Sequence, residues 1–278
     1  MSQADKSTAE LSPTELLRRY QLFAKKSWGQ CFLHDRKIVE AIVDAAQLDG
    51  ADRVLEIGAG LGILTVALAR RVKRVIAIER DRELVTVLGD VFSELDNVEL
   101  IAANALEFDY SAFDPPIAVI GNLPYNISSP ILFRLLEQRS GISSVTIMLQ
   151  RELAERIASP PGSRTYGAPS VICQHLAQVK TCLHVGRGAF TPPPNVDSTV
   201  IHLALREQIS TPTLLDAVVK AAFGQRRKTL LRALSSRFEK TAVKEALSSS
   251  GIPSSERAEK LDPEAFVALA EALEALGS

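Results

Sequence analysis

Nearly continuous apolar runs and amphipathic segments alternate along residues 35–159. Apolar runs without a polar face are typical of strands buried on both sides, and they occur at 52–60, 73–81, 97–106, 116–125 and 143–150. Segments with apolar residues three and four positions apart predict helices, and they occur at 35–48, 61–72, 81–92, 129–138 and 151–159. Ser128 or Ser129 is placed to cap the helix over 129–138. This alternation predicts an α/β fold with a parallel sheet and helices on both faces.

The pattern changes towards the end of the chain. A helix is predicted over 171–179, strands are predicted over 180–186 and 199–205, and a linker follows at 206–212. Only helical spacing follows, over 214–223, 227–238, 242–251 and 262–276. We therefore expect three parts: a flexible lead over 1–24 with a short helix from Pro13, a Rossmann-like domain over 25–206, and a small all-α domain over 207–278.

Composition narrows the class of protein. The chain has 278 residues, of which 46% are hydrophobic and 23% charged, enough to build a globular core. The net charge of −1 means that a nucleic acid would have to be held by a local basic patch. Cys31, Cys173 and Cys182 are far apart and no histidines cluster, so we expect neither disulfides nor a metal site. Together with the absence of a secretory signal or membrane-spanning segment, this favours the cytoplasm.

A glycine turn follows the first predicted strand. Gly58, Gly60 and Gly62 lie between that strand and the next helix, where glycine allows a ligand to approach the backbone. The spacing G-x-G-x-G differs from the G-x-G-x-x-G of dinucleotide sites, and Glu56 would repel a phosphate. A cationic ligand fits better, and S-adenosylmethionine carries both a sulfonium and an amino group. The alternative is that the glycines only allow close packing of helix and strand.

Two further residues stand at strand ends. Glu79 ends the second strand, where a carboxylate can accept hydrogen bonds from both ribose hydroxyls. Asn104 ends the third strand, and its amide could bind the adenine edge of the cofactor. The alternatives are a solvated charge for Glu79 and an ordinary turn residue for Asn104.

The sequence Asn122-Leu123-Pro124-Tyr125 ends the fourth strand. An exocyclic amine of a nucleobase is a poor nucleophile, because its lone pair is delocalised into the ring. The side-chain oxygen of Asn122 and the carbonyl of Leu123 could accept hydrogen bonds from both amine hydrogens, while Pro124 fixes the backbone. Tyr125 offers a face on which a flipped base can stack. The motif predicts methyl transfer to a base amine, with catalysis by positioning and electrostatics.

These motifs resemble the ribosomal RNA adenine N6-dimethyltransferase family, in particular the branch that dimethylates two adjacent adenosines near the 3′ end of small-subunit RNA. The resemblance covers the chain from Lys25 onward and rests on KKSWGQCFL, LEIGAGLGILT, IERD, NAL, NLPYNIS, MLQRELAERI, YGAPSV, FTPPPNVDS and FGQRRKTLLRAL. It implies cofactor contacts from Gln30, Cys31, Leu33, Gly58, Gly60, Glu79, Asn104 and Asn122. It also implies that Phe190 cradles the base opposite Tyr125, whereas Phe190 without the resemblance could be a core aromatic.

The sequence departs from the family pattern at two cofactor positions. Asn104 stands where the family usually has Asp, and Cys31 stands where Asn or His is usual. Asn104 can still accept a hydrogen bond from the adenine amine but lacks the charge, so we expect a modestly lower cofactor affinity. Cys31 is expected to contribute only its backbone.

Basic residues suggest contacts with RNA. Arg226, Arg227 and Lys228 form a run that is predicted to open a helix, and Lys25 with Lys26 lies near the predicted cofactor entrance. These cations could neutralise phosphates, although a basic run on a helix is also typical of a solvated face. The low net charge favours recognition by shape, which suits a pre-assembled small ribosomal subunit. We expect a monomer.

Three other functions share part of this pattern. A nicotinamide dehydrogenase would have the same fold class but another glycine spacing, and it leaves Asn122 to Tyr125 unexplained. A large-subunit rRNA adenine methylase that confers antibiotic resistance would share the chemistry; the helical C-terminal part and Leu123 favour the small-subunit enzyme. A non-catalytic nucleic-acid-binding protein would not need the intact sequence from Asn122 to Tyr125.

Overall fold

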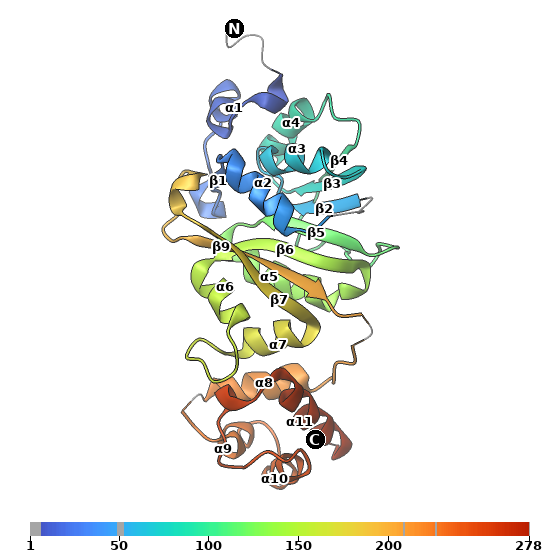
Figure 1. Ribbon diagram of the computed structural model, residues 1–278, viewed down its shortest axis with the longest axis vertical. Coiled ribbons are helices and arrows are strands. Elements are labelled where there is room, and N and C mark those ends of the chain that lie inside the picture. Colours follow the sequence, from blue (N-terminus) through green and yellow to red (C-terminus); the bar gives the residue numbers. More distant parts are fainter. Residues whose placement is uncertain (1–6, 49–52, 208, 226, 278) are drawn as a thin grey trace. The chain divides into compact units, whose positions relative to one another are not determined.

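The computed structural model describes residues 7–48, 53–207, 209–225 and 227–277 (Figure 1). The chain divides into two compact units. The first unit contains Met1–Ala154 and Lys180–Leu205, and the second contains Glu155–Val179 and Arg206–Ser278. This division differs from the predicted domains, because residues 155–179 belong with the C-terminal helices. The sequence pattern could not indicate this, since an amphipathic helix does not specify the unit against which its apolar face packs.

A seven-stranded sheet is the centre of the first unit, with the order β4-β3-β2-β5-β6-β9-β7. Its strands are β2 (Arg53–Ile57), β3 (Arg74–Glu79), β4 (Val98–Ala102), β5 (Ile117–Asn122), β6 (Ile142–Gln150), β7 (Ala177–Val185) and β9 (Ser198–Leu205). The strands from β4 to β6 are parallel, but β9 runs antiparallel to β6. The sheet is therefore mixed rather than parallel, a difference that the sequence concealed because β9 is buried on both faces in either direction.

Helices alternate with most of the parallel strands and flank the sheet, so the predicted α/β class is confirmed. They are α2 (Arg36–Ala45), α3 (Ile63–Ala69), α4 (Arg82–Val91) and α5 (Tyr125–Glu137). Apolar residues of α2 and α3 form one buried cluster with Val54 and Val75, and residues of α4 form another with Ala77. A short pair of strands, β1 (Phe32–Leu33) and β8 (Phe190–Thr191), joins two loops of this unit antiparallel. The carboxyl ends of β2, β3 and β5 are thus held by a rigid core.

The N-terminal segment is more ordered than a flexible lead. Helix α1 (Pro13–Arg19) begins at a capping box, in which the Ser12 hydroxyl accepts from the backbone of Glu15 and the Glu15 carboxylate accepts from the backbone of Ser12. Leu16 is 2% exposed and packs in the same cluster as Leu84 and Val87 of α4. The structure describes residues 7–24 of the predicted lead, and these include the packed helix α1. The sequence pattern did not indicate this packing, because the apolar residues that α1 contacts lie far away in the sequence.

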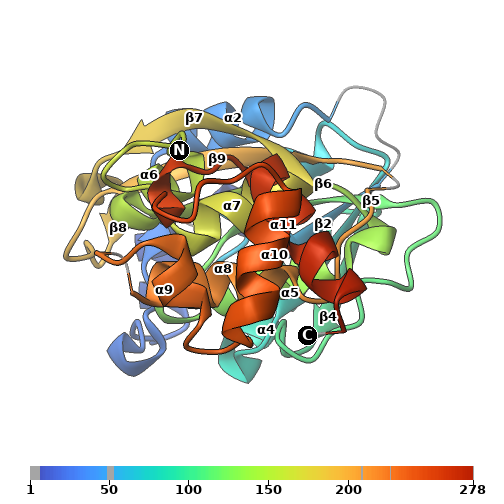
Figure 2. The ribbon, with the colours of Figure 1, turned by 90° about the horizontal axis from the view of Figure 1, so that it is seen from below.

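The second unit contains helices that enclose their own core. They are α7 (Ala168–Leu176), α8 (Leu215–Gly224), α9 (Leu230–Leu234), α10 (Lys240–Ser249) and α11 (Pro263–Ala275), and α6 (Arg151–Ala158) spans the division between the units. Helices α10 and α11 lie side by side (Figure 2). Phe266 is fully buried in this core, together with Leu230 and Leu234. The described helices include none that is both long and apolar enough to cross a membrane.

Candidate active site

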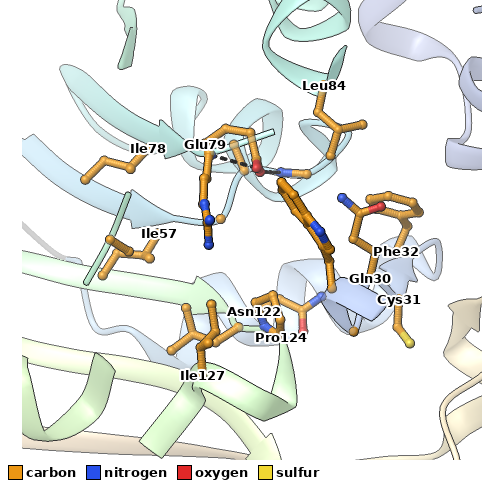
Figure 3. A pocket seen from close by; sticks show the side chains of 18 of the residues that line it. Gln30, Cys31, Phe32, Ile57, Ile78, Glu79, Leu84, Asn122, Pro124 and Ile127 are labelled. Atoms are coloured by element: carbon orange, nitrogen blue, oxygen red, sulfur yellow. Dashed lines mark hydrogen bonds between the residues drawn. The ribbon is translucent and has the colours of Figure 1, made fainter. Parts of the chain in front are cut away.

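A cavity of about 340 Å³ lies at the carboxyl ends of β2, β3 and β5. Figure 3 shows Glu79 and Leu84 on one side of it, and Asn122 and Pro124 on the other. Twelve of the predicted site residues line this cavity: Gln30, Cys31, Leu33, Glu56, Gly58, Gly60, Glu79, Asn104, Asn122, Leu123, Pro124 and Tyr125. The fold therefore brings together the predicted cofactor residues and the predicted base-binding motif.

The glycine turn forms one wall of the cavity. Gly58 and Gly60 have φ angles of 76° and 61°, in the left-handed region that favours glycine. Gly62 serves another purpose, because a side chain there would come within 2.9 Å of Phe92. Gly58 and Gly60 thus line the cavity, and the approach of a ligand to their backbone stays a prediction. Gly62 allows close packing as the alternative supposed, but of α3 against α4 rather than of a helix against a strand.

Glu56 is a buried carboxylate with an unsatisfied oxygen. The residue is 1% exposed, and its Oε2 atom has no hydrogen-bond partner in the described part of the chain. Burial raises the pKa of Glu56 to about 8; the charge of Glu79 adds to this shift, and the nearby hydroxyl of Thr65 opposes it. A cation beside this carboxylate would stabilise its charged form. The site thus fits a ligand that carries a sulfonium and an ammonium group.

Glu79 is fixed at the end of β3 by backbone amides. One carboxylate oxygen accepts from Gly60 N at 2.9 Å, and the other accepts from Arg80 N and Asp81 N at 2.8 Å each (Figure 3 draws hydrogen bonds at this site). Burial raises the pKa of Glu79, while these backbone hydrogen bonds act in the opposite direction. The carboxylate is therefore held in one orientation at the cavity wall, where it can accept from ribose hydroxyls.

Asp81 is a structural member of the site that the sequence did not reveal. It accepts from Gln30 Nε2 and from Lys25 Nζ, both at 2.8 Å, and Gln30 Oε1 accepts from Lys25 N at 2.8 Å. Lys25 also forms a close ion pair with Glu83. Lys25, predicted to bind RNA, is thus engaged in tying its loop to the start of α4. The only indication in the sequence that Asp81 belongs to the site was its position directly after Glu79 and Arg80.

The side chain of Asn104 is occupied within its own turn. Its amide nitrogen donates to Glu107 Oε1 at 2.7 Å, and its oxygen accepts from Leu106 N at 3.2 Å. Asn104 therefore lines the cavity while acting as the turn residue that the alternative interpretation described.

Asn122 ends β5, and the two predicted acceptors are the Asn122 side-chain oxygen and the Leu123 carbonyl. Among the described residues, neither the Asn122 side chain nor the Leu123 carbonyl has a hydrogen-bond partner. Pro124 is the N-cap of α5 with φ −56°, and the helix begins at Tyr125. The predicted cap at Ser128 or Ser129 was wrong, because the helix already begins at Tyr125, directly after its N-cap Pro124. Ser128 lies in the first turn, where its hydroxyl donates to the Tyr125 carbonyl at 3.1 Å.

Phe190 and Cys31 flank the cavity differently. Phe190 is 3% exposed, lies opposite Leu33 in the β1–β8 pair, and is not part of the cavity wall. Its position matches a core aromatic rather than a cradle for a base. Cys31 lines the cavity, and burial raises the pKa of its thiol, so the thiol is neutral near pH 7.

The remaining predicted RNA-binding residues that the structure describes are exposed. Lys26 is exposed in a short 3-10 helix, Lys26–Trp28, beside the cavity. Arg227 and Lys228 are exposed in a turn of the second unit, and α9 begins only at Leu230, so this basic run does not open the helix as predicted. The reason is Thr229, whose extended backbone makes it the N-cap. Arg226 lies outside the described residues.

Trp28 is a second site residue that the sequence analysis missed. It lines the cavity and is 39% exposed. The guanidinium of Arg80 and the ammonium of Lys25 lie 5.0 and 5.2 Å from the centroid of its ring. In the sequence, the only indication of this role was an aromatic residue immediately before Gly29 in the KKSWGQCFL segment. The structure shows that Gly29 has a left-handed backbone.

Binding of S-adenosylmethionine is expected to change the fluorescence of Trp28. Because this is the single tryptophan of the chain, its emission reports on the cavity alone. A titration monitored by fluorescence should show a saturable change, and its dissociation constant should match that from calorimetry. NAD+, which does not absorb where tryptophan emits, is the negative control. Emission that stays constant at calorimetric saturation with S-adenosylmethionine would contradict the assignment of the cavity.

The glycine turn after β2, the carboxylates in β2 and β3 and the polar-aromatic motif after β5 define an S-adenosylmethionine-dependent methyltransferase. The chain belongs to the ribosomal RNA adenine dimethylase family, whose sequence profile matches residues 22–275. It is thus an enzyme that methylates adenine in ribosomal RNA. The dehydrogenase and the non-catalytic alternatives are not supported.

Relatives extend over nearly the whole chain. Two are named ribosomal RNA small subunit methyltransferase A: that of Myxococcus xanthus is 42% identical over 94% of this chain and 95% of its own, and that of Anoxybacillus flavithermus is 40% identical over 93% of each. A solved dimethyladenosine transferase from Plasmodium falciparum is 27% identical, with a TM-score of 0.77 over 88% of this chain and 98% of its own. The 23S rRNA methyltransferase ErmE is 28% identical, with a TM-score of 0.68 over 87% and 99%.

Proposed function

We propose that this enzyme transfers methyl groups to the N6 amines of two adjacent adenosines near the 3′ end of small-subunit (16S) ribosomal RNA, yielding N6,N6-dimethyladenosine. The observation that carries the proposal is that Asn122 and the Leu123 carbonyl, two acceptors without a hydrogen-bond partner among the described residues, line one cavity with Tyr125. The small subunit as substrate is supported by the names of the relatives with about 40% identity.

In the proposed mechanism, the residues of this chain bind and orient two ligands. When bound, S-adenosylmethionine supplies a methyl group on a positively charged sulfur. Glu79 holds ribose hydroxyls and Glu56 balances positive charge, while Gly58 and Gly60 let the ligand approach the backbone. The Asn122 oxygen and the Leu123 carbonyl accept from the two amine hydrogens, which stabilises positive charge as it develops on nitrogen. Tyr125 provides a stacking face. The methylated nitrogen is cationic until it releases its proton to water, so no general base is required to activate the amine beforehand.

The substrate is proposed to be a pre-assembled small subunit, and methylation is proposed as a late step of ribosome assembly. Lys26, Arg227 and Lys228 are exposed cations that can contact phosphates, whereas the net charge of −1 disfavours strong binding to arbitrary RNA. We also propose that the enzyme acts as a monomer in the cytoplasm, where its substrate is assembled.

The large subunit is the second candidate substrate, because the structure is also similar to that of ErmE. Incubation with labelled S-adenosylmethionine is expected to label undermethylated small subunits at two adjacent adenosines and to leave isolated large subunits unlabelled. Mapping of the modified nucleotides by mass spectrometry checks both statements. If only large-subunit RNA is labelled, the large subunit rather than the small subunit is the substrate.

A further inference from the structure

A hydrogen bond joins the base-binding motif to a distant strand. The hydroxyls of Tyr125 and Ser198 are 2.6 Å apart. Tyr125 lines the cavity, whereas Ser198 is fully buried as the first residue of β9. Across the described residues, neither hydroxyl has any other hydrogen-bond partner. The bond therefore holds the far end of the tyrosine ring, while α5 holds its backbone.

The strand register places Ser198 in the same rigid sheet as Asn122. Asn122 lies opposite Met148 of β6, and Met148 lies opposite Val200 of β9. Ser198 precedes Val200 by two residues and lies opposite Gln150 at the end of β6. The three neighbouring strands β5, β6 and β9 thus connect the anchor of the tyrosine ring with the residue that ends β5. The distance between the ring and Asn122 is set by the sheet as well as by the loop.

The residue before Ser198 is itself held in place. The Asp197 carbonyl accepts from Arg151 N at 3.0 Å, and Asp197 Oδ1 accepts from Arg187 N at 3.3 Å. The Asp197 carboxylate also pairs with the Arg151 guanidinium at 3.4 Å. Ser198 is thus a fixed point to which a mobile side chain can be attached.

We propose that Ser198 is a positioning residue that orients the ring of Tyr125 for stacking against the target base. This inference rests on the proposed base-binding role of residues 122–125. Because Ser198 occupies the phenol hydroxyl, Tyr125 presents the face of its ring, rather than a hydrogen bond, to the base. Burial raises the pKa of Tyr125, so the phenol is neutral near pH 7. A ring in the first turn of α5 would otherwise rotate among several rotamers.

A double-mutant cycle tests this proposal. Ser198→Ala and Tyr125→Phe each remove one half of the hydrogen bond and keep the aromatic ring, so each should lower kcat about tenfold through misorientation. The double variant should lose no more than about tenfold, because both single changes break the same bond. The Kd for S-adenosylmethionine should stay at the wild-type value in all three variants. Wild-type kcat in either single variant, or losses that multiply to about a hundredfold, would overturn the proposal.

Ser128→Ala is the matched control. Ser128 is also buried, and its hydroxyl bonds the backbone carbonyl of Tyr125 rather than the ring, so wild-type kcat is expected. If Ser198→Ala unfolds, Tyr125→Phe decides the question, because it leaves the buried serine in place. All rates are compared with wild type on whichever ribosomal RNA the enzyme methylates. If the proposed small-subunit substrate is wrong, the error therefore appears when the nucleotides methylated by the wild-type enzyme are mapped. It does not change the ratios of variant to wild-type rates.

Discussion

Asn122→Ala is expected to lower kcat for methyl transfer by about 100- to 1,000-fold, the range for loss of one preorganised polar group that stabilises developing charge. The side chain lines the cavity and has no hydrogen-bond partner in the described structure, so its oxygen is available to the substrate amine. Truncation leaves the backbone of β5 and the core beneath it unchanged. Single-turnover methylation and RNA binding should be measured on the same preparation, and the Kd for RNA should change little.

The variant Asn122→Asp distinguishes the role of the side-chain oxygen of Asn122 as an acceptor from the role of its amide nitrogen. A carboxylate oxygen of similar size can still accept a hydrogen bond from the amine, so this variant should retain more activity than the alanine variant. Equal activity of Asn122→Ala and wild type would remove the proposed role of this residue. Equal loss in both variants would mean that the amide nitrogen of Asn122, rather than its oxygen, is required.

The strand-end residues of the site could be predicted because local pattern and topology agree there. Buried strands alternating with helices imply parallel strands whose carboxyl ends meet at one edge, which brings Glu79 and Asn122 to one cavity. The glycine turn between strand and helix was likewise predicted, and the positive φ angles of Gly58 and Gly60 explain why glycine is favoured there.

Contacts between distant segments could not be predicted in this way. Lys25 forms an ion pair with Asp81, which is 56 residues away in sequence, and the charge of Lys25 alone does not indicate this partner. Phe190 follows a strand and precedes three prolines, and only the pairing of β8 with β1 shows that its ring is buried. The antiparallel direction of β9 was hidden for a similar reason, because a strand that is apolar on both faces has the same pattern in either direction.

The stability of the protein without cofactor is expected to fall as the pH rises from about 4.5 to about 8, because of Glu56. Its pKa is raised from 4.5 to about 8 in the folded protein, so between these values the folded state holds a proton that the unfolded state has lost. Stability therefore decreases with rising pH and levels off above pH 8. The upper limit is about 5 kcal/mol, from 1.36 kcal/mol per pKa unit. Glu56→Gln should remove this part of the pH dependence in chemical denaturation.

Cofactor binding should remove the proton that Glu56 holds in the folded protein without cofactor. A cationic ligand beside Glu56 favours the carboxylate, so binding at pH 6–7 should release up to one proton, and affinity should rise by up to about tenfold per pH unit until pH 8. Calorimetry in two buffers of different ionisation enthalpy measures the proton count. The ligand's own amino group titrates equally in both proteins, so the difference between wild type and Glu56→Gln isolates the carboxylate. Identical proton release in the two proteins would show that the cation is bound away from Glu56, and the unsatisfied oxygen would then need another explanation.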